Sequence, residues 1–103
     1  MNEKKLKQIY YALSDEIRLK ILKLLSDNGE LCVYQLLPVL NISQPNLSFH
    51  LRILRDTDLV KSEKRGKWVF YSLDKENPIL LANLEFIKSI KLDKTPSDLS
   101  CVT

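Results

Sequence analysis

The stretch NISQPNLSFHLRILRDTDLVKSEKRGKWVFYSL, residues 41–73, decides the fold of this chain. The apolar residues of its first half recur at helical spacing, at Leu47, Leu51 and Leu54. Ser43 before them is a favoured N-cap residue, and Pro45 suits the first turn of a helix, where its missing N–H costs nothing. The pattern predicts a short helix that turns its leucines inward and ends near residues 57–58.

The second half of the stretch predicts a β-hairpin. Residues 60–64 and 67–73 are predicted as strands around Arg65 and Gly66, and the second strand is rich in aromatic and β-branched side chains. Gly66 supplies the positive φ that a tight hairpin needs. Residues 60–67 contain four cations, opposed only by Glu63: Lys61, Lys64, Arg65 and Lys67. Such a cluster makes a stronger local field than the diffuse net charge of +3.

Three helices are expected before this stretch and one after it. The upstream apolar residues recur at helical spacing over residues 6–13, 17–25 and 33–40. Ser14, followed by two acidic residues, is expected to cap the second helix, and residues 30–33 to form a short connector. Pro38 should keep the third helix short or kinked. After the hairpin, Asn77 and Pro78 are expected to begin the last helix.

The order of these elements is α-α-α-α-β-β-α, which is a winged helix-turn-helix: mainly α with a β-hairpin. Residues 1–92 are expected to form one domain, and residues 93–103 a flexible C-terminal tail. The last helix has more apolar residues than one buried stripe needs. Together with the first helix it could therefore form a dimer interface.

Composition limits the class of protein. The chain has 45% hydrophobic and 28% charged residues, as ordinary soluble proteins do. No apolar run approaches the roughly 20 residues of a membrane span, and no signal peptide is evident. Two cysteines are too few for a disulfide framework, so a cytoplasmic location with reduced thiols is expected. No paired catalytic groups or glycine-rich phosphate loop indicate an enzyme.

Four motifs together resemble those of one protein family. They are ALSDEIRLKILKLL, ELCVYQL, SQPNLSFHLRILRDTDLV and GKWVFYSL, at residues 12–25, 30–36, 43–60 and 66–73. Over nearly the whole ordered chain the sequence resembles the ArsR/SmtB family of metal- and stress-sensing repressors. The resemblance implies a homodimer formed by the first and last helices and repression of a promoter. It also implies release from DNA when an effector binds, with no cofactor required.

The predicted interface with double-stranded DNA has two parts. With the leucines inward, the outer or flanking faces of the recognition helix present Gln44, Asn46, Ser48, Phe49 and Arg52. Glutamine and asparagine can pair with adenine in the major groove, and serine can bind a base or a phosphate. At the hairpin tip, phosphate or minor-groove contacts are expected from Lys64, Arg65 and Lys67. A dimer would present two such units about 34 Å apart and bind an inverted repeat.

Some of these residues allow other interpretations. Phe49 could contact a thymine methyl group, or it could pack against the hairpin or a neighbouring helix. An apolar recognition face would suit a winged helix that binds another protein. The basic hairpin favours DNA binding over such a protein-interaction module. It also favours DNA binding over a hairpin tip whose charges are only solvated. His50 is the only histidine, and beside the inward leucines it is expected to be a hydrogen-bonded, partly buried structural residue.

The two cysteines are the candidate effector-binding residues, and Cys32 is the candidate metal ligand. The arsenic-responsive branch, to which the chain is particularly similar, has further cysteines where this sequence has Tyr34 and Leu37. Cys32 and Cys101, within or between subunits, could bind arsenite with fewer or mixed ligands. The same pair could form a disulfide or polysulfide in a redox or persulfide sensor. Burial would instead make Cys32 an inert small apolar side chain.

Overall fold

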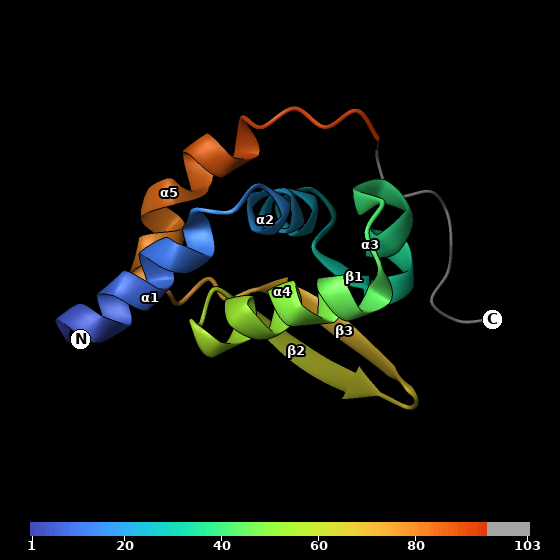
Figure 1. Ribbon diagram of the computed structural model, residues 1–103, viewed down its shortest axis with the longest axis horizontal. Coiled ribbons are helices and arrows are strands. Elements are labelled where there is room, and N and C mark those ends of the chain that lie inside the picture. The colour runs from blue at the N-terminus through green and yellow to red at the C-terminus, as the bar shows by residue number, and fades with distance from the viewer. Residues whose placement is uncertain (95–103) are drawn as a thin grey trace.

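The computed structural model describes residues 1–94, and Figure 1 shows the arrangement of its elements. They are α1 (Glu3–Leu13), α2 (Glu16–Asn28), β1 (Glu30–Cys32), α3 (Val33–Leu40), α4 (Gln44–Asp56), β2 (Val60–Arg65), β3 (Trp68–Leu73) and α5 (Pro78–Lys88). The predicted winged helix-turn-helix is confirmed, with one strand added. The tail predicted at residues 93–103 lies outside the described residues from position 95 onward.

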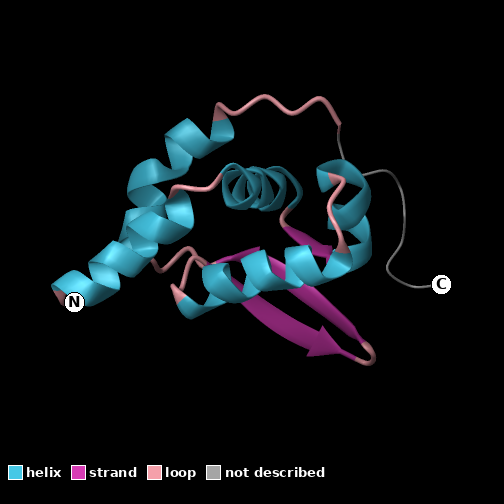
Figure 2. Ribbon diagram, viewed as in Figure 1, coloured by secondary structure: helices cyan, strands magenta, loops and turns pink. Residues whose placement is uncertain are grey.

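The sheet has three antiparallel strands in the order β1-β3-β2, so the hairpin has a neighbour along β3 (Figure 2). The residues of β1, Glu30, Leu31 and Cys32, pair with Ser72, Tyr71 and Phe70. The prediction that residues 30–33 form only a connector is therefore wrong. A strand of three residues is too short to show the alternation by which a strand is recognised, and its partner strand is remote in the sequence.

Capping side chains set the ends of the helices. Asp15 caps α2, its carboxylate accepting a hydrogen bond of 3.0 Å from the backbone N–H three residues further on. Ser14 instead ends α1, so the predicted cap was wrong by one residue, because the charged aspartate suits the helix dipole better. Ser43 and Asn77 cap α4 and α5 as predicted. Pro38 lies inside α3, which has only 8 residues, as expected of a helix with an interior proline.

At the centre of the core, α2 contacts each of the other four helices and also β1 and β3. In Figure 1 it is seen almost end-on, with the other helices around it. Its buried apolar side chains are Ile21, Leu22, Leu24 and Leu25. Because α4 packs against α2, α3 and β2, the position of the recognition helix is fixed relative to both the helical core and the hairpin.

Candidate nucleic-acid interface

The inner face of α4 is buried, as its leucine spacing predicts. The exposed fractions of Leu47, Leu51 and Leu54 are 0%, 1% and 0%. Burial of a leucine side chain contributes roughly 2 kcal/mol to folding, so three of them hold the helix firmly against the core. The side chains on the opposite face of α4 are therefore presented from a rigid base.

His50 lies on the buried side of α4 and is 7% exposed. Its Nδ1 lies 3.0 Å from Nη1 of Arg18, a residue of α2 that is itself 3% exposed. Arginine can only donate, so Nδ1 accepts and the imidazole is neutral. Burial lowers the pKa of His50; the carboxylate of Asp15, 3.8 Å from Nδ1, opposes this effect, and Arg18 adds to it. The prediction of a hydrogen-bonded structural histidine is confirmed.

The guanidinium of Arg18 also binds the end of α1. Its Nε donates to the carbonyl of Ala12 at 2.9 Å, and Nη2 donates to the carbonyl of Tyr11 at 3.1 Å. The guanidinium carbon lies 4.9 Å from the centroid of the Tyr11 ring. One buried cation thus connects α1, α2 and, through His50, the recognition helix. Sequence reasoning missed Arg18, because nothing in the pattern of α2 marks this basic residue as buried.

The outer face of α4 carries the exposed side chains that were predicted to contact DNA: Gln44, Asn46, Ser48, Phe49 and Arg52. Beside it lies a hollow of about 490 Å³ that is lined by Pro45, Ser48, Phe49, Arg52, Arg55 and Tyr71. The structure therefore brings three of the five predicted residues together, whereas Gln44 and Asn46 lie outside the hollow. Arg55 follows Arg52 at helical spacing and could have been found from the sequence. Tyr71 comes from β3, and only the fold places it here.

Phe49 is half-exposed, at 43%. Its ring centroid lies 5.4 Å from that of His50 in an edge-on arrangement, and the guanidinium carbon of Arg52 lies 6.0 Å from the Phe49 ring. The ring therefore packs partly on neighbours of its own helix, while the remainder lines the hollow. The ring contacts above are with residues of α4 itself and not with the hairpin or a neighbouring helix, and contact with a thymine methyl group stays a prediction.

The pleat of the sheet divides the hairpin cations between two faces. Lys64 pairs with Val69, two residues from Tyr71, so Lys64 lies on the sheet face that borders the α4 hollow. Arg65 is the next residue and lies on the opposite face. The turn falls at Gly66 and Lys67, one residue later than predicted, because β2 continues to Arg65.

Arg65 is engaged with two carboxylates. Its Nη1 and Nη2 lie 2.6 and 2.9 Å from the oxygens of Glu30 in β1, and its Nε and Nη2 each lie 3.2 Å from those of Glu63. The guanidinium carbon lies 4.8 Å from the centroid of the Phe70 ring. The hydrogen bond to Glu30, followed by that to Glu63, raises the pKa of Arg65, and the hydrogen bond from Arg65 lowers the pKa of Glu63. The charge of Arg65 at the surface is therefore already paired with the carboxylates of Glu30 and Glu63.

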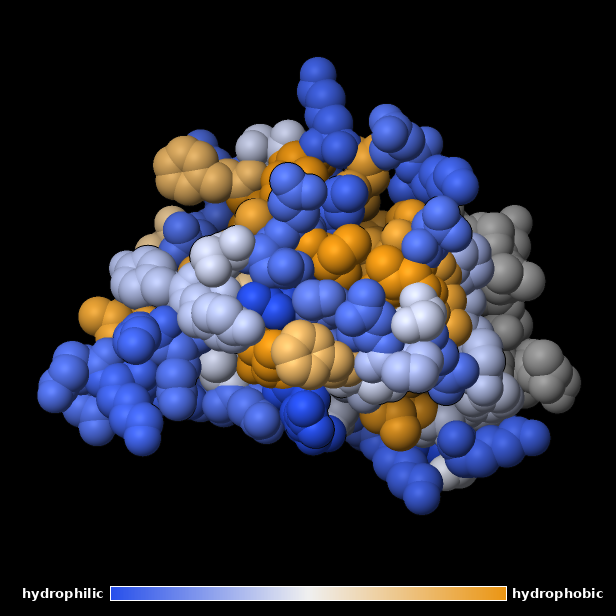
Figure 3. All heavy atoms as spheres, in the orientation of Figure 1, coloured by the Kyte–Doolittle hydropathy of each residue, from blue (hydrophilic) through white to orange (hydrophobic). Residues whose placement is uncertain are grey.

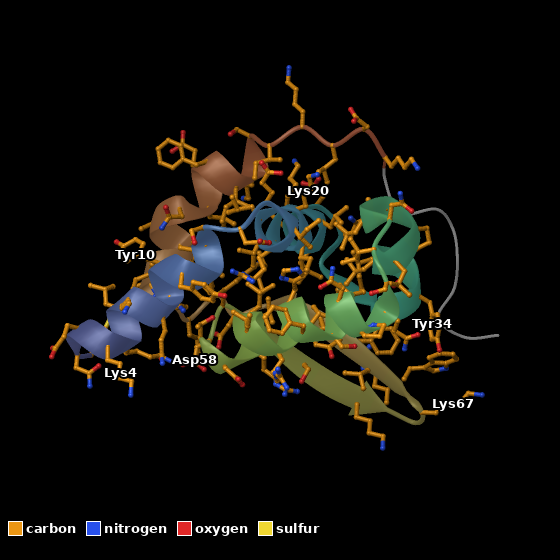
Figure 4. The ribbon with its side chains drawn as sticks, viewed as in Figure 1. Lys4, Tyr10, Lys20, Tyr34, Asp58 and Lys67 are labelled. Atoms are coloured by element: carbon orange, nitrogen blue, oxygen red, sulfur yellow. The ribbon has the colours of Figure 1, made fainter. Side chains whose placement is uncertain are left out.

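Lys64 and Lys67 make no ion pair with a carboxylate of residues 1–94. The ammonium of Lys67 lies 5.4 Å from the centroid of the Trp68 ring, which meets the ring of Tyr34 edge-on at 5.3 Å. Figure 4 shows Lys67 at the hairpin turn and Tyr34 at the same end of the molecule. In Figure 3 the tip of the hairpin is covered by hydrophilic side chains. The exposed charge of the tip therefore comes from its lysines.

Cys32 stands at the N-cap position of α3 and is 1% exposed. Its backbone N–H donates to Oε1 of Gln35 at 3.0 Å. Cys101, its predicted companion, lies outside the described residues. Tyr34 is exposed and Leu37 is packed against the core, so neither position supplies a further soft ligand. Among residues 1–94, no three or more His, Cys, Asp or Glu side chains are grouped as metal ligands would be.

Within the described part of the chain, no helix has the length and apolar character to cross a membrane.

Comparisons with known proteins agree with this geometry. Residues 15–62 match the family described as "Bacterial regulatory protein, arsR family". The chain is 46% identical over 77 residues to an arsenical resistance operon repressor of Escherichia coli (strain K12), covering 75% of this chain and 66% of that one. It is 46% identical over 76 residues to the arsenical resistance operon repressor of Staphylococcus xylosus, covering 74% and 72% of the two chains.

A solved structure extends the likeness to the fold. HlyU from Vibrio cholerae N16961 matches with a TM-score of 0.71 and 37% identity, covering 84% of this chain and 94% of that one. The matched stretch spans about two thirds of the E. coli repressor, the first of the curated relatives above. Family match, sequence identity and fold agree: the chain belongs to the arsR family of bacterial regulatory proteins.

Proposed function

We propose that the protein is a sequence-specific DNA-binding repressor of transcription that a thiol-reactive effector releases from its operator. The observation that carries the first half is the construction of α4. Its inner face is buried leucine, and its outer face presents polar and cationic side chains beside a hollow that contains Arg52 and Arg55. A helix so anchored can enter a major groove without losing order.

The two parts of the interface would have different tasks. Gln44, Asn46 and Ser48 lie on the N-terminal half of α4 and can hydrogen-bond base edges, with the exposed part of Phe49 beside them. Arg52 and Arg55 lie further along the helix and suit phosphate. Lys64 and Lys67 would bind the backbone beside the groove.

Dimerisation through α1 and α5 is part of the proposal. These two helices lie toward one end of the molecule (Figure 1) and carry large exposed apolar side chains: Leu6, Tyr10, Leu81 and Phe86. Phe86 is 72% exposed, which is costly for a phenylalanine unless a partner covers it. A second copy of the chain would cover this surface and set the spacing of two recognition helices. The operator would then be an inverted repeat.

The proposed effector is arsenite or a related metalloid, which the reduced protein would bind through the thiolates of Cys32 and Cys101. The relatives above are named as arsenical resistance repressors, and thiolates are the ligands that soft metalloids select. Trivalent arsenic prefers three thiolates, and a chain with two cysteines must use mixed ligands or a partner subunit. Cys32 is the N-cap residue of α3, the helix packed against α4, so a ligand there would act close to the recognition helix.

DNA binding is tested by fluorescence anisotropy with a duplex from the region upstream of the protein's own gene, at about 150 mM salt. Specific binding should be at least about a thousandfold tighter than binding to a scrambled duplex of equal length. A duplex with one half-site removed should bind markedly more weakly, because one recognition helix of the dimer would lack its site. Equal affinity for all three duplexes would refute a sequence-specific dimer.

The effector is tested by intact-mass spectrometry after treatment with arsenite, using the wild type, Cys32→Ser and Cys101→Ser. We expect an arsenic adduct in the wild type that is lost in Cys32→Ser, and release of DNA in parallel. A persulfide donor in a separate arm separates the redox alternative from metalloid binding. If arsenite forms no adduct and leaves the anisotropy unchanged, the effector half of the proposal fails while the DNA half stands.

A further inference from the structure

A second hollow lies away from the recognition helix, where α2, the sheet and α5 meet. Its volume is about 340 Å³, within the lower range of small-molecule sites. Its walls come from the end of α2, from β2 and β3, from the loop after β3 and from the second half of α5. Elements distant in the sequence thus converge on one small space.

The charged residues that line this hollow all have the same sign. Lys61 of β2, Lys75 of the loop after β3 and Lys88 of α5 line it, and no acidic side chain does. None of the three makes an ion pair with a carboxylate of residues 1–94. Like charges around one hollow repel one another, and the repulsion is relieved when an anion binds between them.

The remaining walls supply hydrogen-bonding and apolar groups. Ser26 and Ser72 provide hydroxyls, which can donate to an anion. Leu25 and Leu84 provide apolar surface beside the lysines. The carbonyl of Leu25, near the end of α2, already accepts from the backbone N–H of Gly29 at 2.9 Å, so it is not left to bind an ammonium. Cations, hydroxyls and apolar surface together fit a ligand that is anionic at one end only.

This hollow is separate from the DNA-facing one. The two share no lining residue. On β3, Tyr71 borders the α4 hollow and Ser72 borders this one, and consecutive strand residues leave opposite faces of the sheet. Lys61 is the register partner of Ser72 and shares its face. The side chains of Lys61 and Ser72 would therefore hold an anion on the sheet face opposite to the one from which Tyr71 lines the α4 hollow.

We propose that this hollow binds a small organic anion: an oxyanion group held by Lys61, Lys75 and Lys88, with a short apolar body against Leu25 and Leu84. Binding joins the hairpin to α5 through the ligand. The site does not involve a cysteine, so it is distinct from the thiol effector site.

The probe is phenyl phosphate, titrated into the full-length protein without DNA and followed by amide chemical shifts. We expect saturable shifts at Gly29, Lys61 and Ser72. Inorganic phosphate, which lacks the apolar body, should bind more weakly, and phenol, which lacks the anion, should not bind there. Because no DNA is present, this result is independent of the proposed repressor function.

The decisive variant is Lys61→Gln with Lys88→Gln, which should raise the dissociation constant of phenyl phosphate about tenfold or more. The matched control is Lys4→Gln with Lys7→Gln, the same change of charge on exposed lysines of α1, which should leave the constant within about twofold. Equal weakening by both double variants would show a diffuse charge effect and overturn the proposal. So would shifts confined to α4, equal binding of inorganic phosphate, or no saturation by about 10 mM phenyl phosphate.

Discussion

The recognition helix and the hairpin use their polar side chains in opposite ways. On α4 the anchoring groups are buried, and the outer side chains remain exposed beside an open hollow. On the hairpin, the most strongly hydrogen-bonding cation, Arg65, is held by Glu30 and Glu63 and lies over Phe70. The density of basic residues is therefore a poor guide to the charge available for DNA. What matters is which cations the fold has already paired.

The largest expected effect concerns the buried side of α4. Leu51→Ala should lower the free energy of unfolding by about 2–5 kcal/mol, because it leaves a cavity where the side chain was 1% exposed. Phe49→Ala, on the half-exposed side of the same helix, should cost much less stability and still weaken DNA binding. Chemical denaturation measures both variants. Similar losses of stability in the two variants would show that α4 is not held in place mainly by its buried leucine face.

Next in size is the effect of removing a base-reading group. Gln44→Ala should cost about 1–3 kcal/mol in binding to the operator and little in binding to a scrambled duplex, because an amide pairs with a base and not with a phosphate. Arg52→Ala should weaken both duplexes alike. Anisotropy with the two duplexes separates these outcomes. If Gln44→Ala weakened both equally, Gln44 would not read sequence.

A smaller effect on DNA binding is expected from the hairpin, where Lys64 and Arg65 should differ. Lys64→Ala should flatten the dependence of log K on log salt by about one unit, since Lys64 lies on the face beside α4 and makes no ion pair within residues 1–94. Arg65→Ala should flatten it less, because Glu30 and Glu63 already offset that charge. Affinities measured across a salt series test the order. A larger change for Arg65→Ala would mean that DNA displaces both carboxylates.

The smallest effect is a dependence of stability on pH through His50. Its pKa is lowered in the folded protein, chiefly by burial, so the unfolded chain takes up the proton first as the pH falls below about 6.5. Stability from this group is therefore complete above that pH and declines below it, down to the folded pKa. His50→Gln should remove this part of the slope. Urea unfolding of both proteins at a series of pH values measures it, and identical slopes would contradict the assignment.

Local signals made most of the fold predictable. The leucines of α4 and the caps Ser43 and Asn77 act within a few residues of chain, so their effects can be read from neighbouring positions. By contrast, β1 is only Glu30–Cys32, and nothing local shows that it pairs with β3.

The site was less predictable for the same reason. Arg65 meets Glu30 across 35 residues, and Arg18 meets His50 across 32, so both pairings depend on tertiary structure. Which cations are available to DNA could not be read from their spacing alone.

The contact between Arg18 and His50 also has a consequence for synthesis on the ribosome. The carbonyls of Tyr11 and Ala12 are made before Arg18, but His50 follows it by 32 residues. At a synthesis rate of about 5–20 residues per second, His50 is made roughly 2–6 s after Arg18. Its Nδ1 is therefore the last of the three acceptors of the guanidinium to be made. During that interval the α1–α2 pair carries a cation with an unused donor. The contact between Arg18 and His50 therefore forms only after the recognition helix has been synthesised.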